Sequence, residues 1–235
     1  GHTSNLAYTG YEPIIIDVGN RVRDWVAGDC TGDDVLALMD ELQADYLSGG
    51  LEPVAVAARD FTMEETAQLS AEAFRQAAGT DVGLVTLGGY HDGVQNRSAV
   101  CGKLFAGDIS QEIVNAVVPG TFRDPICTLT LTGAELKDLL ETGFFYDPEV
   151  AAFPYVPAGL TVTKNKDGTV KEVVMADGSP LDVAASYTVA VDQGGFTDDV
   201  GRAGNAVETD LIVVDVAGAY FSAHSPLVPL EPSLK

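Results

Sequence analysis

The sequence predicts a mixed α/β fold without regular βαβ winding, and three features predict it. Amphipathic helical patterns alternate with short apolar strands in the first half of the chain. Short strands separated by Gly-containing turns dominate the last third. The chain has 235 residues, of which 46% are hydrophobic and 20% charged, so it is long and apolar enough to bury a sizeable core.

The first 60 residues predict a strand, a helix and a second strand. The apolar run Ile14-Ile15-Ile16 indicates the first strand. Thr31, with Asp34 three residues later, resembles a helix N-cap. Helical spacing of apolar residues then predicts an amphipathic helix from Asp34, with Val35, Leu36, Leu38, Met39, Leu42 and Tyr46 on its apolar side. The second strand is expected at 52–58, after Ser48-Gly49-Gly50.

The stretch 80–93 is expected to organise the rest of the fold. A capping box at Thr62 and Glu65 predicts a helix that ends at Gly79. A buried strand at 82–87 follows, and the pair Gly88-Gly89 ends it. Glycine tolerates positive φ and the close approach of a ligand. This pattern therefore indicates either an ordinary strand end or the entrance of a binding site in an α/β fold.

The remaining elements are predicted from capping residues and alternation. Residues 96–106 predict a loop, and Asp108-Ile109-Ser110 caps a short helix at 111–117. A strand at 127–131 turns through Thr132-Gly133 into a helix at 134–142. The last third predicts a hairpin at 159–175, a turn at 177–180 and a strand at 187–191. A further apolar segment at 211–216 precedes a helix at 216–223, and the tail after Ser225 is expected to be loosely ordered.

The charge balance excludes two classes of partner. The chain has 35 Asp and Glu against 13 Lys and Arg, a formal net charge of −22. Binding to a nucleic acid polymer or to an anionic membrane surface requires clustered Lys and Arg, so both are excluded. No run of 18 apolar residues occurs, so no membrane insertion by a helix is expected.

Catalysis contained within this chain is the weaker hypothesis. The histidines His2, His91 and His224 have no paired-ligand spacing. The three cysteines also lack metal-ligand spacing and are expected to be small buried hydrophobes: Cys30, Cys101 and Cys127. Neither a nucleophile elbow nor a P-loop is present. The sequence therefore predicts no catalytic residue, metal or cofactor in this chain and favours a binding function.

Seven short segments in a fixed order carry a resemblance to a known family. The two with the most weight are Leu131-Thr132-Gly133, which begins a helix, and Gly178-Ser179-Pro180-Leu181-Asp182, which leads to Tyr187. The others are 86–91, 106–110, 121–124, 152–160 and 194–195. Over residues 54–201 they resemble the C-terminal domain of the 5′-nucleotidase family, which includes bacterial UDP-sugar hydrolases and 2′,3′-cyclic phosphodiesterases.

The resemblance implies a layered α/β/β/α fold with mixed sheets. In this family a separate N-terminal metallophosphoesterase domain holds two divalent metals and hydrolyses the substrate. The C-terminal domain holds the nucleoside between two aromatic rings. Residues 1–53 are then expected to be the tail of the upstream domain plus a bridging helix, and residues 54–235 the substrate-binding domain. The resemblance also implies export, to the periplasm, the cell surface or the extracellular space.

Carried over residue by residue, the resemblance implies a site with several substitutions. The family's Asn or Ser before the glycines falls on Thr86, and its ligand-contacting Arg falls on His91. One stacking ring is retained as Phe122, whereas the second ring falls on Ala190 and the ribose-binding Asp on Phe196. The expected substrate-binding residues are Thr86, Gly88, Gly89, His91, Phe122, Arg123, Asp124, Gly194, Gly195 and Phe196.

Two functions of different classes stay open. The chain is the substrate-recognition domain for a nucleotide or nucleoside, or it is a binding module that kept the fold and lost the nucleotide. The replaced Arg, Asp and second ring favour the binding module. A third option, an independent hydrolase, predicts phosphate release with added divalent metal, and none is expected from this chain alone.

Overall fold

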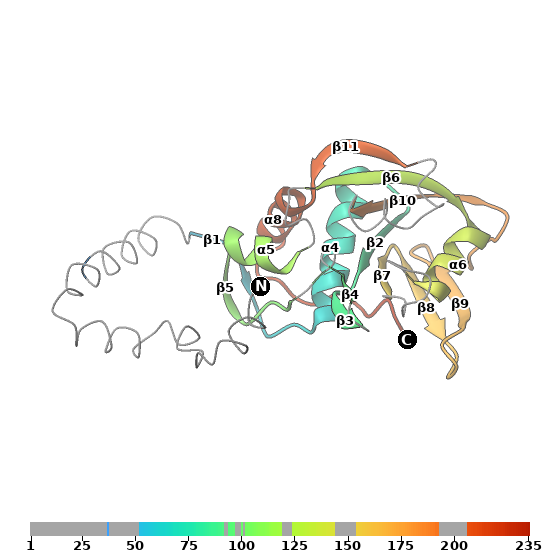
Figure 1. Cartoon of the computed structure of the whole chain (residues 1–235), viewed down its shortest axis with the longest axis horizontal. Helices are drawn as coiled ribbons and strands as arrows, with labels where there is room; N and C mark the ends of the chain where they lie inside the picture. Colours follow the sequence, from blue (N-terminus) through green and yellow to red (C-terminus); the bar gives the residue numbers. More distant parts are fainter. Residues whose placement is uncertain are drawn as a thin grey trace, which may run out of the picture. The chain divides into compact units, whose positions relative to one another are not determined.

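The computed structural model describes the unit Pro53–Lys235, with gaps. The described residues are 37, 52–91, 94–96, 100, 102–118, 124–143, 154–192 and 206–235. The strand predicted at 14–16 lies outside these residues, as does the helix predicted from Asp34 to Tyr46 except for Ala37, which is helical. Figure 1 shows the elements of the unit by their labels.

A five-stranded mixed sheet forms the centre of the unit. Its strand order is β11-β6-β10-β2-β7. The strands are β2 (Val82–Thr86), β6 (Pro125–Thr132), β7 (Tyr155–Ala158), β10 (Ser186–Asp192) and β11 (Val207–Ile212). β10 and β2 are parallel, and the other neighbouring pairs are antiparallel. The mixed α/β fold with mixed sheets is therefore confirmed.

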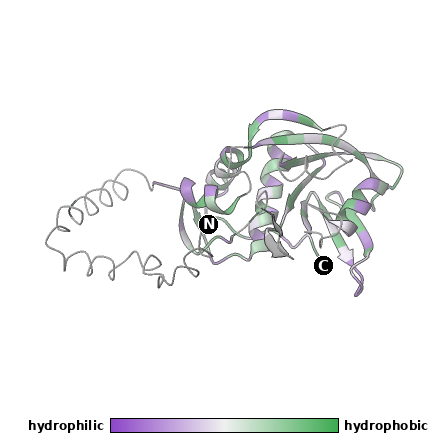
Figure 2. Cartoon of the chain, in the orientation of Figure 1, coloured by the Kyte–Doolittle hydropathy of each residue, from purple (hydrophilic) through white to green (hydrophobic). Residues whose placement is uncertain are grey.

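One face of the sheet is covered by helices and by a small second sheet. The helices are α4 (Met63–Ala78), α5 (Gln111–Val117) and α8 (Val213–Ala223). The small sheet pairs β1 (Pro53–Ala57) with β5 (Gly107–Ser110). Phe74 of α4 and Phe221 of α8 are fully buried in the core of this face, together with Val85 and Ala190 of the sheet. Figure 2 shows apolar residues on the strands and on the sides of the helices that face the sheet.

The other face packs against α6 (Gly133–Thr142) and the hairpin of β8 (Leu160–Lys164) and β9 (Val170–Met175). Val82 and Leu84 belong to this second core, whereas Val85 belongs to the first, because side chains of a strand alternate between its two faces. A short separate hairpin, β3 (Gly89–His91) with β4 (Val94–Asn96), follows β2.

The predicted capping residues begin their helices as expected. Thr62 and Glu65 form a reciprocal capping box at α4, which ends at Gly79 in the left-handed conformation, φ 66°. Ser110 caps α5, and its hydroxyl accepts a hydrogen bond from the Ile113 amide. A further capping box, Thr132 with Glu135, begins α6 at Gly133.

The capping box of α6 predicts a pH-dependent stability. The Thr132 amide (2.7 Å) and then its hydroxyl (2.8 Å) donate to the Glu135 carboxylate and hold the pKa of that carboxyl below its ordinary value. A carboxyl with a lowered folded-state pKa contributes stability that is present above its unfolded pKa and is lost as pH falls through the folded pKa. Glu135→Gln is therefore expected to melt at a lower temperature than the unsubstituted chain at pH 7, and the difference is expected to shrink as pH falls below the ordinary pKa of a glutamate.

Thermal unfolding followed by circular dichroism at several pH values measures this difference. Glu172→Gln is a matched control, because Glu172 is an exposed carboxylate in a strand and does not cap a helix. A melting-temperature difference for Glu135→Gln that does not shrink as the pH is lowered through the acid range contradicts the prediction.

The tail after Ser225 is ordered, and the prediction of a loose tail is wrong. The Leu227 amide donates to the Val56 carbonyl of β1 (2.7 Å), and the Ala58 amide donates to the Leu227 carbonyl (3.0 Å). At its other end the tail pairs with β8, where the Val162 amide donates to the Ser233 carbonyl (2.7 Å). The tail thus extends both small sheets, and its local composition could not show this because the partners lie far away in the sequence.

Two boundaries also differ from the sequence prediction. The apolar segment at 211–216 is divided, because β11 ends at Ile212 and α8 begins at Val213, three residues before the predicted start of the helix. Asp108, expected as part of a helix cap, belongs with Gly107 to β5, which pairs with β1. The first difference arises because an apolar run fits a buried strand and a buried helix equally well. The second arises because the pairing partner of β5 is β1, which lies far away in the sequence.

Candidate functional site

One edge of the central sheet gathers the described residues of the expected site. Because β2 and β10 are parallel, their carboxyl ends lie at the same edge. β6 and β7 run antiparallel to them and therefore begin there (Figure 1). In open α/β sheets, ligands bind outside the carboxyl ends of parallel strands. We call this place the carboxyl edge and define it by Thr86, Gly88, Asp124 and Asp192.

The Thr86–Gly88 segment is held by backbone hydrogen bonds on both sides. The Thr86 carbonyl accepts from the Val100 amide (3.0 Å), and the Gly88 amide donates to the Val100 carbonyl (2.8 Å). On the other side, the Leu87 amide donates to the Pro154 carbonyl (3.2 Å). The Thr86 side chain is fully buried and Gly88 is half-buried. These hydrogen bonds therefore fix the backbone position at which the pair Gly88-Gly89 begins.

Two carboxylates flank the beginning of β6. Asp124 directly precedes β6 and is half-buried, and Asp192 ends β10 opposite Ile126 with an exposed fraction of 2%. Burial, followed by the negative charges of Glu208, Asp192 and Asp124, raises the pKa of the nearby Cys127 thiol to about 11. Cys127 is a buried free thiol, as its sequence interpretation proposed. At such a pKa it is a thiol rather than a thiolate and is a poor nucleophile.

Sequence reasoning included Asp124 in the site but missed Asp192. The sequence signal was present, because Asp192 stands two residues before the pair Gly194-Gly195. Aligning the segment on those glycines assigned the second ring to Ala190 and the ribose-binding position to Phe196 instead. In the structure Ala190 is fully buried within the core that contains α4, so its side chain does not line an open surface.

The other expected site residues lie partly or wholly outside the described residues. The backbone of Gly89 and His91 forms β3, directly after Gly88, but their side chains are not described. Phe122, Arg123, Gly194, Gly195 and Phe196 lie outside the described residues. In the sequence, Phe122 and Arg123 directly precede Asp124, and the glycines follow Asp192 by two residues. All these segments therefore connect to the carboxyl edge.

Two cavities among the described residues lie away from this edge. One of about 280 Å³ lies at the opposite end of the sheet, beyond the last turn of α4, and is lined by Thr80, Thr128, Thr130 and Thr188 among others. The other, of about 240 Å³, lies between the first turns of α4 and the tail, beside Ser233. Neither contains a residue of the expected site.

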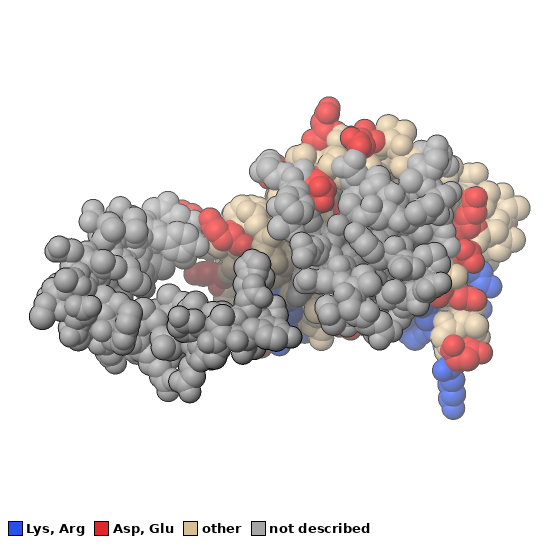
Figure 3. Space-filling view, viewed as in Figure 1, with Lys and Arg blue, Asp and Glu red and all other residues tan. Residues whose placement is uncertain are grey.

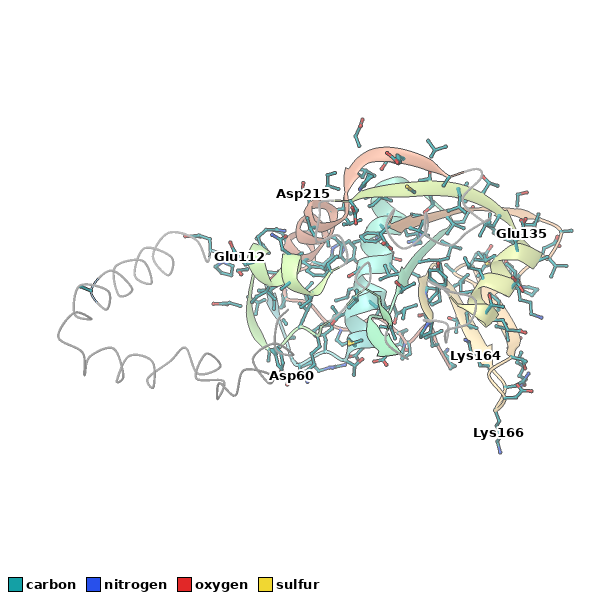
Figure 4. The ribbon with its side chains drawn as sticks, in the orientation of Figure 1. Asp60, Glu112, Glu135, Lys164, Lys166 and Asp215 are labelled. Carbon is teal, nitrogen blue, oxygen red and sulfur yellow. The ribbon has the colours of Figure 1, made fainter. Side chains whose placement is uncertain are left out.

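Most of the lysines lie far from the carboxyl edge. Five of the six lysines belong to α6, to the β8–β9 hairpin and its loop, or to the end of the tail: Lys137, Lys164, Lys166, Lys171 and Lys235. Figure 3 shows these basic side chains at one end of the described surface, and Figure 4 labels Lys164 and Lys166 there. The acidic residues labelled at the other end, Glu112 and Asp215, lie on α5 and α8 (Figure 4).

The described residues contain no candidate metal centre. No group of three or more His, Cys, Asp or Glu side chains gathers in this part of the chain. His224, at the end of α8, instead stacks on Tyr220 with ring centroids 4.0 Å apart. Within the same part of the chain, none of the helices has the length and apolar character needed to cross a membrane.

Comparisons with known proteins identify the class of protein that has this fold. The central mixed sheet, with helices on one face and a helix and hairpin on the other, is the fold of 5′-nucleotidase-like proteins. The family model described as "5'-nucleotidase, C-terminal domain" matches residues 27–202, which is well over half of the chain. The chain belongs to this family. Curated protein sequences gave no match.

Solved structures of several bacterial proteins share the fold. A 5′-nucleotidase precursor from Thermus thermophilus is 20% identical with a TM-score of 0.63, over 86% of this chain and 43% of that chain. A sulfate thiohydrolase from Thermus thermophilus is 22% identical with a TM-score of 0.55, over 87% and 38%. The NAD nucleotidase of Haemophilus influenzae is 15% identical with a TM-score of 0.57, over 92% and 44%.

These similarities establish only the fold and how much of each protein's length this chain spans. The chain spans less than half the length of each of these proteins. Their names also differ in substrate, since one is a sulfate thiohydrolase and another an NAD nucleotidase. The fold therefore does not by itself determine which ligand this chain binds.

Proposed function

We propose that this chain is the substrate-recognition domain of a 5′-nucleotidase-like metallophosphoesterase and binds a nucleoside or nucleotide. The observation that carries the proposal is the convergence of separate sequence segments at the carboxyl edge. Thr86 and Gly88 come from the end of β2, Asp124 from the start of β6 and Asp192 from the end of β10. Membership of the 5′-nucleotidase C-terminal-domain family supports the proposal.

Hydrolysis belongs, in this proposal, to an N-terminal domain of the same protein that holds two divalent metals. The described residues do not fit such a metal centre, because they offer no cluster of three ligands. Residues 1–53 are the tail of that upstream domain with a bridging helix, and residues 54–235 are the recognition domain. The protein is exported, to the periplasm, the cell surface or the medium, and this chain alone hydrolyses no phosphate ester.

The second candidate is a binding module that kept the fold and lost the nucleotide. The burial of Ala190 favours it, because a ring at this position would lie in the helix-covered core and not at the carboxyl edge. The sulfate thiohydrolase among the structural neighbours also shows that the fold occurs in a protein named for another substrate.

Isothermal titration calorimetry with adenosine, AMP and a UDP-sugar tests the proposal. We expect heat with at least one ligand and about tenfold weaker binding in Phe122→Ala, because stacking of one base contributes about 1–3 kcal/mol. Phe105→Ala is the matched control, because Phe105 is 59% exposed and lies outside the expected site. Absence of heat with all three ligands would favour the binding module. Phosphate release by the chain with added divalent metal would instead support an independent hydrolase.

A further inference from the structure

The cavity beside the tail is lined by two buried polar side chains with unused hydrogen-bonding capacity. It measures about 240 Å³ and lies between the first turns of α4 and the tail. Ser233 is 3% exposed and Gln68 is 8% exposed, and both residues line this cavity. The Ser233 hydroxyl has no hydrogen-bond partner among the described residues. The Gln68 Nε2 atom donates to the Glu231 carbonyl (2.7 Å), whereas its Oε1 atom accepts no hydrogen bond within the same part of the chain.

The backbone of the tail holds Ser233 at this position. The Ser233 carbonyl accepts from the Val162 amide of β8 (2.7 Å), and the Lys235 amide donates to the Val162 carbonyl (2.9 Å). The tail is therefore anchored on both sides of Leu234, and the Ser233 hydroxyl cannot reach another partner without breaking these bonds. An unpaired hydroxyl in the interior is destabilising, and the large majority of buried polar side-chain atoms have a partner. Ser233 therefore indicates that the cavity receives a polar group.

The hydrogen-bonding capacities of the two side chains define the chemistry of that group. The Gln68 Oε1 atom only accepts hydrogen bonds, whereas the Ser233 hydroxyl both donates and accepts. A ligand hydroxyl matches both, because it can accept from Ser233 and donate to Gln68. An ammonium group can only donate, and an ether or an ionised carboxylate can only accept. A hydroxyl is therefore the group that fits the two side chains best.

The other walls of the cavity are partly apolar. Val156 of β7, which is 1% exposed, lines it together with Pro232 and Leu234 of the tail. A volume of about 240 Å³ is also several times the share of one molecule in liquid water, about 30 Å³. The cavity therefore has room and apolar surface for a short hydrocarbon body in addition to a hydroxyl.

We propose that this cavity is a binding site for a small neutral molecule that carries a hydroxyl group on a short apolar body. Ser233 and Gln68 bind the hydroxyl, and the apolar body packs against Val156 and Leu234. Because one wall belongs to α4 and another to the tail, the bound molecule connects the two. The site uses none of the residues that define the carboxyl edge, so the proposal does not depend on the proposed function.

The test compares two isomeric probes on the full chain by nuclear magnetic resonance. Butanediol with terminal hydroxyls and dimethoxyethane contain the same atoms, but the diether has no hydrogen-bond donor. We expect butanediol, titrated through the millimolar range, to shift the signals of the Gln68 side-chain amide and the Ser233 backbone amide until they saturate. Dimethoxyethane is expected to bind about fivefold more weakly, because it cannot donate to Gln68.

Ser233→Ala adds a second readout, with Ser222→Ala as its matched control. Ser233→Ala removes the unpaired hydroxyl and adds no atom, and it is expected to bind butanediol about fivefold more weakly than the unsubstituted chain. Ser222 is exposed on α8 and does not line the cavity, so its replacement should leave the affinity unchanged.

Three results would overturn the proposal. They are the absence of saturable shifts with butanediol, which is the result expected of a cavity that holds water alone, equal affinities for the two isomers, and an unchanged affinity in Ser233→Ala. If Ser233→Ala does not fold, the comparison of the isomers on the unsubstituted chain decides.

Discussion

Replacing Gly133 by alanine is expected to lower the free energy of unfolding by about 3 kcal/mol, the upper end of the usual effect of overpacking. Gly133 is the first residue of α6 and lies under the turn at 182–185. A Cβ there would overlap the Asp182 carbonyl oxygen and would lie 2.9 Å from the Asp182 carbonyl carbon and from the Val183 Cα. These are backbone atoms, so no side-chain rotation relieves the overlap.

The same turn is tied to α6 by hydrogen bonds that the overlap would disrupt. The Gly133 amide donates to the Ala185 carbonyl (2.9 Å), and the Ala134 amide donates to the Val183 carbonyl (3.0 Å). The Tyr187 hydroxyl accepts from the Asp182 amide (3.0 Å) and fixes the turn from the other side. Separating α6 from the turn would therefore expose both amides and loosen the start of β10.

Urea unfolding followed by circular dichroism measures the loss, with Gly178→Ala as the control. Gly178 lies in the turn that follows β9 and has φ 84°, but apart from its own atoms and those of its two chain neighbours, no atom lies within 4 Å of the point that a Cβ would occupy. Its replacement should cost about 1 kcal/mol through backbone strain alone. Gly133 has no positive φ that would itself require glycine, so equal effects of the two substitutions would show that the overlap with Asp182 is relieved at little cost and would contradict the prediction.

This contact explains why the two segments that contribute most to the family resemblance occur together. Leu131-Thr132-Gly133 and Gly178-Ser179-Pro180-Leu181-Asp182 are far apart in the sequence, yet Gly133 packs on Asp182. Their pairing fixes the helix start and the turn before β10. The segments that identified the family therefore serve the scaffold, and they carry little information about the ligand.

Local signals predicted the elements of the fold better than their pairing. The capping box of Thr62 and Glu65 and the hairpin loop at 165–168 depend on neighbouring residues, so the sequence alone indicated them correctly. The pairing of β1 with β5 and with the tail joins residues as distant as Val56 and Ser225, whose hydroxyl accepts from the Val56 amide (3.0 Å). No local composition encodes a partner at that distance.

In the expected site, too, short sequence motifs were recognised correctly, whereas features that depend on distant residues were not. The glycines after β2 and the residue Asp124 were recognised from short motifs, and the structure places Gly88 and Asp124 at one edge. Asp192 was not among the expected residues, because its burial at the end of a central strand depends on what covers that strand. The aromatic residues expected to hold the base, Phe122 and Phe196, lie outside the described residues and stay predictions.

Replacing Gly83 by alanine is expected to have an effect as large as that of Gly133→Ala, about 3 kcal/mol, through a different contact. Gly83 is the second residue of β2 and faces α4. A Cβ there would overlap the Ala71 carbonyl oxygen of α4 and would lie 2.9 Å from the Ala71 carbonyl carbon. The helix would have to move away from the sheet, because a backbone carbonyl in the middle of a helix cannot turn aside without breaking the helix.

That movement would disturb the packing of α4 on the sheet well beyond the site of substitution. Phe74, one turn beyond Ala71, is fully buried in the core between α4 and the sheet. Interiors are packed closely enough that a shift of the helix opens voids around such a side chain while it relieves the overlap. The expected loss of stability therefore combines the overlap at Gly83 with weakened packing at Phe74.

Gly218→Ala in α8 is the matched control for Gly83→Ala. Its new Cβ would crowd the end of the Gln111 side chain, 3.2 Å from the Cδ atom, and that side chain can rotate. The gain in helix propensity, about 1 kcal/mol, offsets the loss of the Gln111 hydrogen bonds, so its unfolding midpoint should change little. Equal urea midpoints for Gly83→Ala and Gly218→Ala would contradict the prediction. They would show that α4 does not pack on β2 at the close distance described, and that the carboxyl edge lies differently relative to the helices.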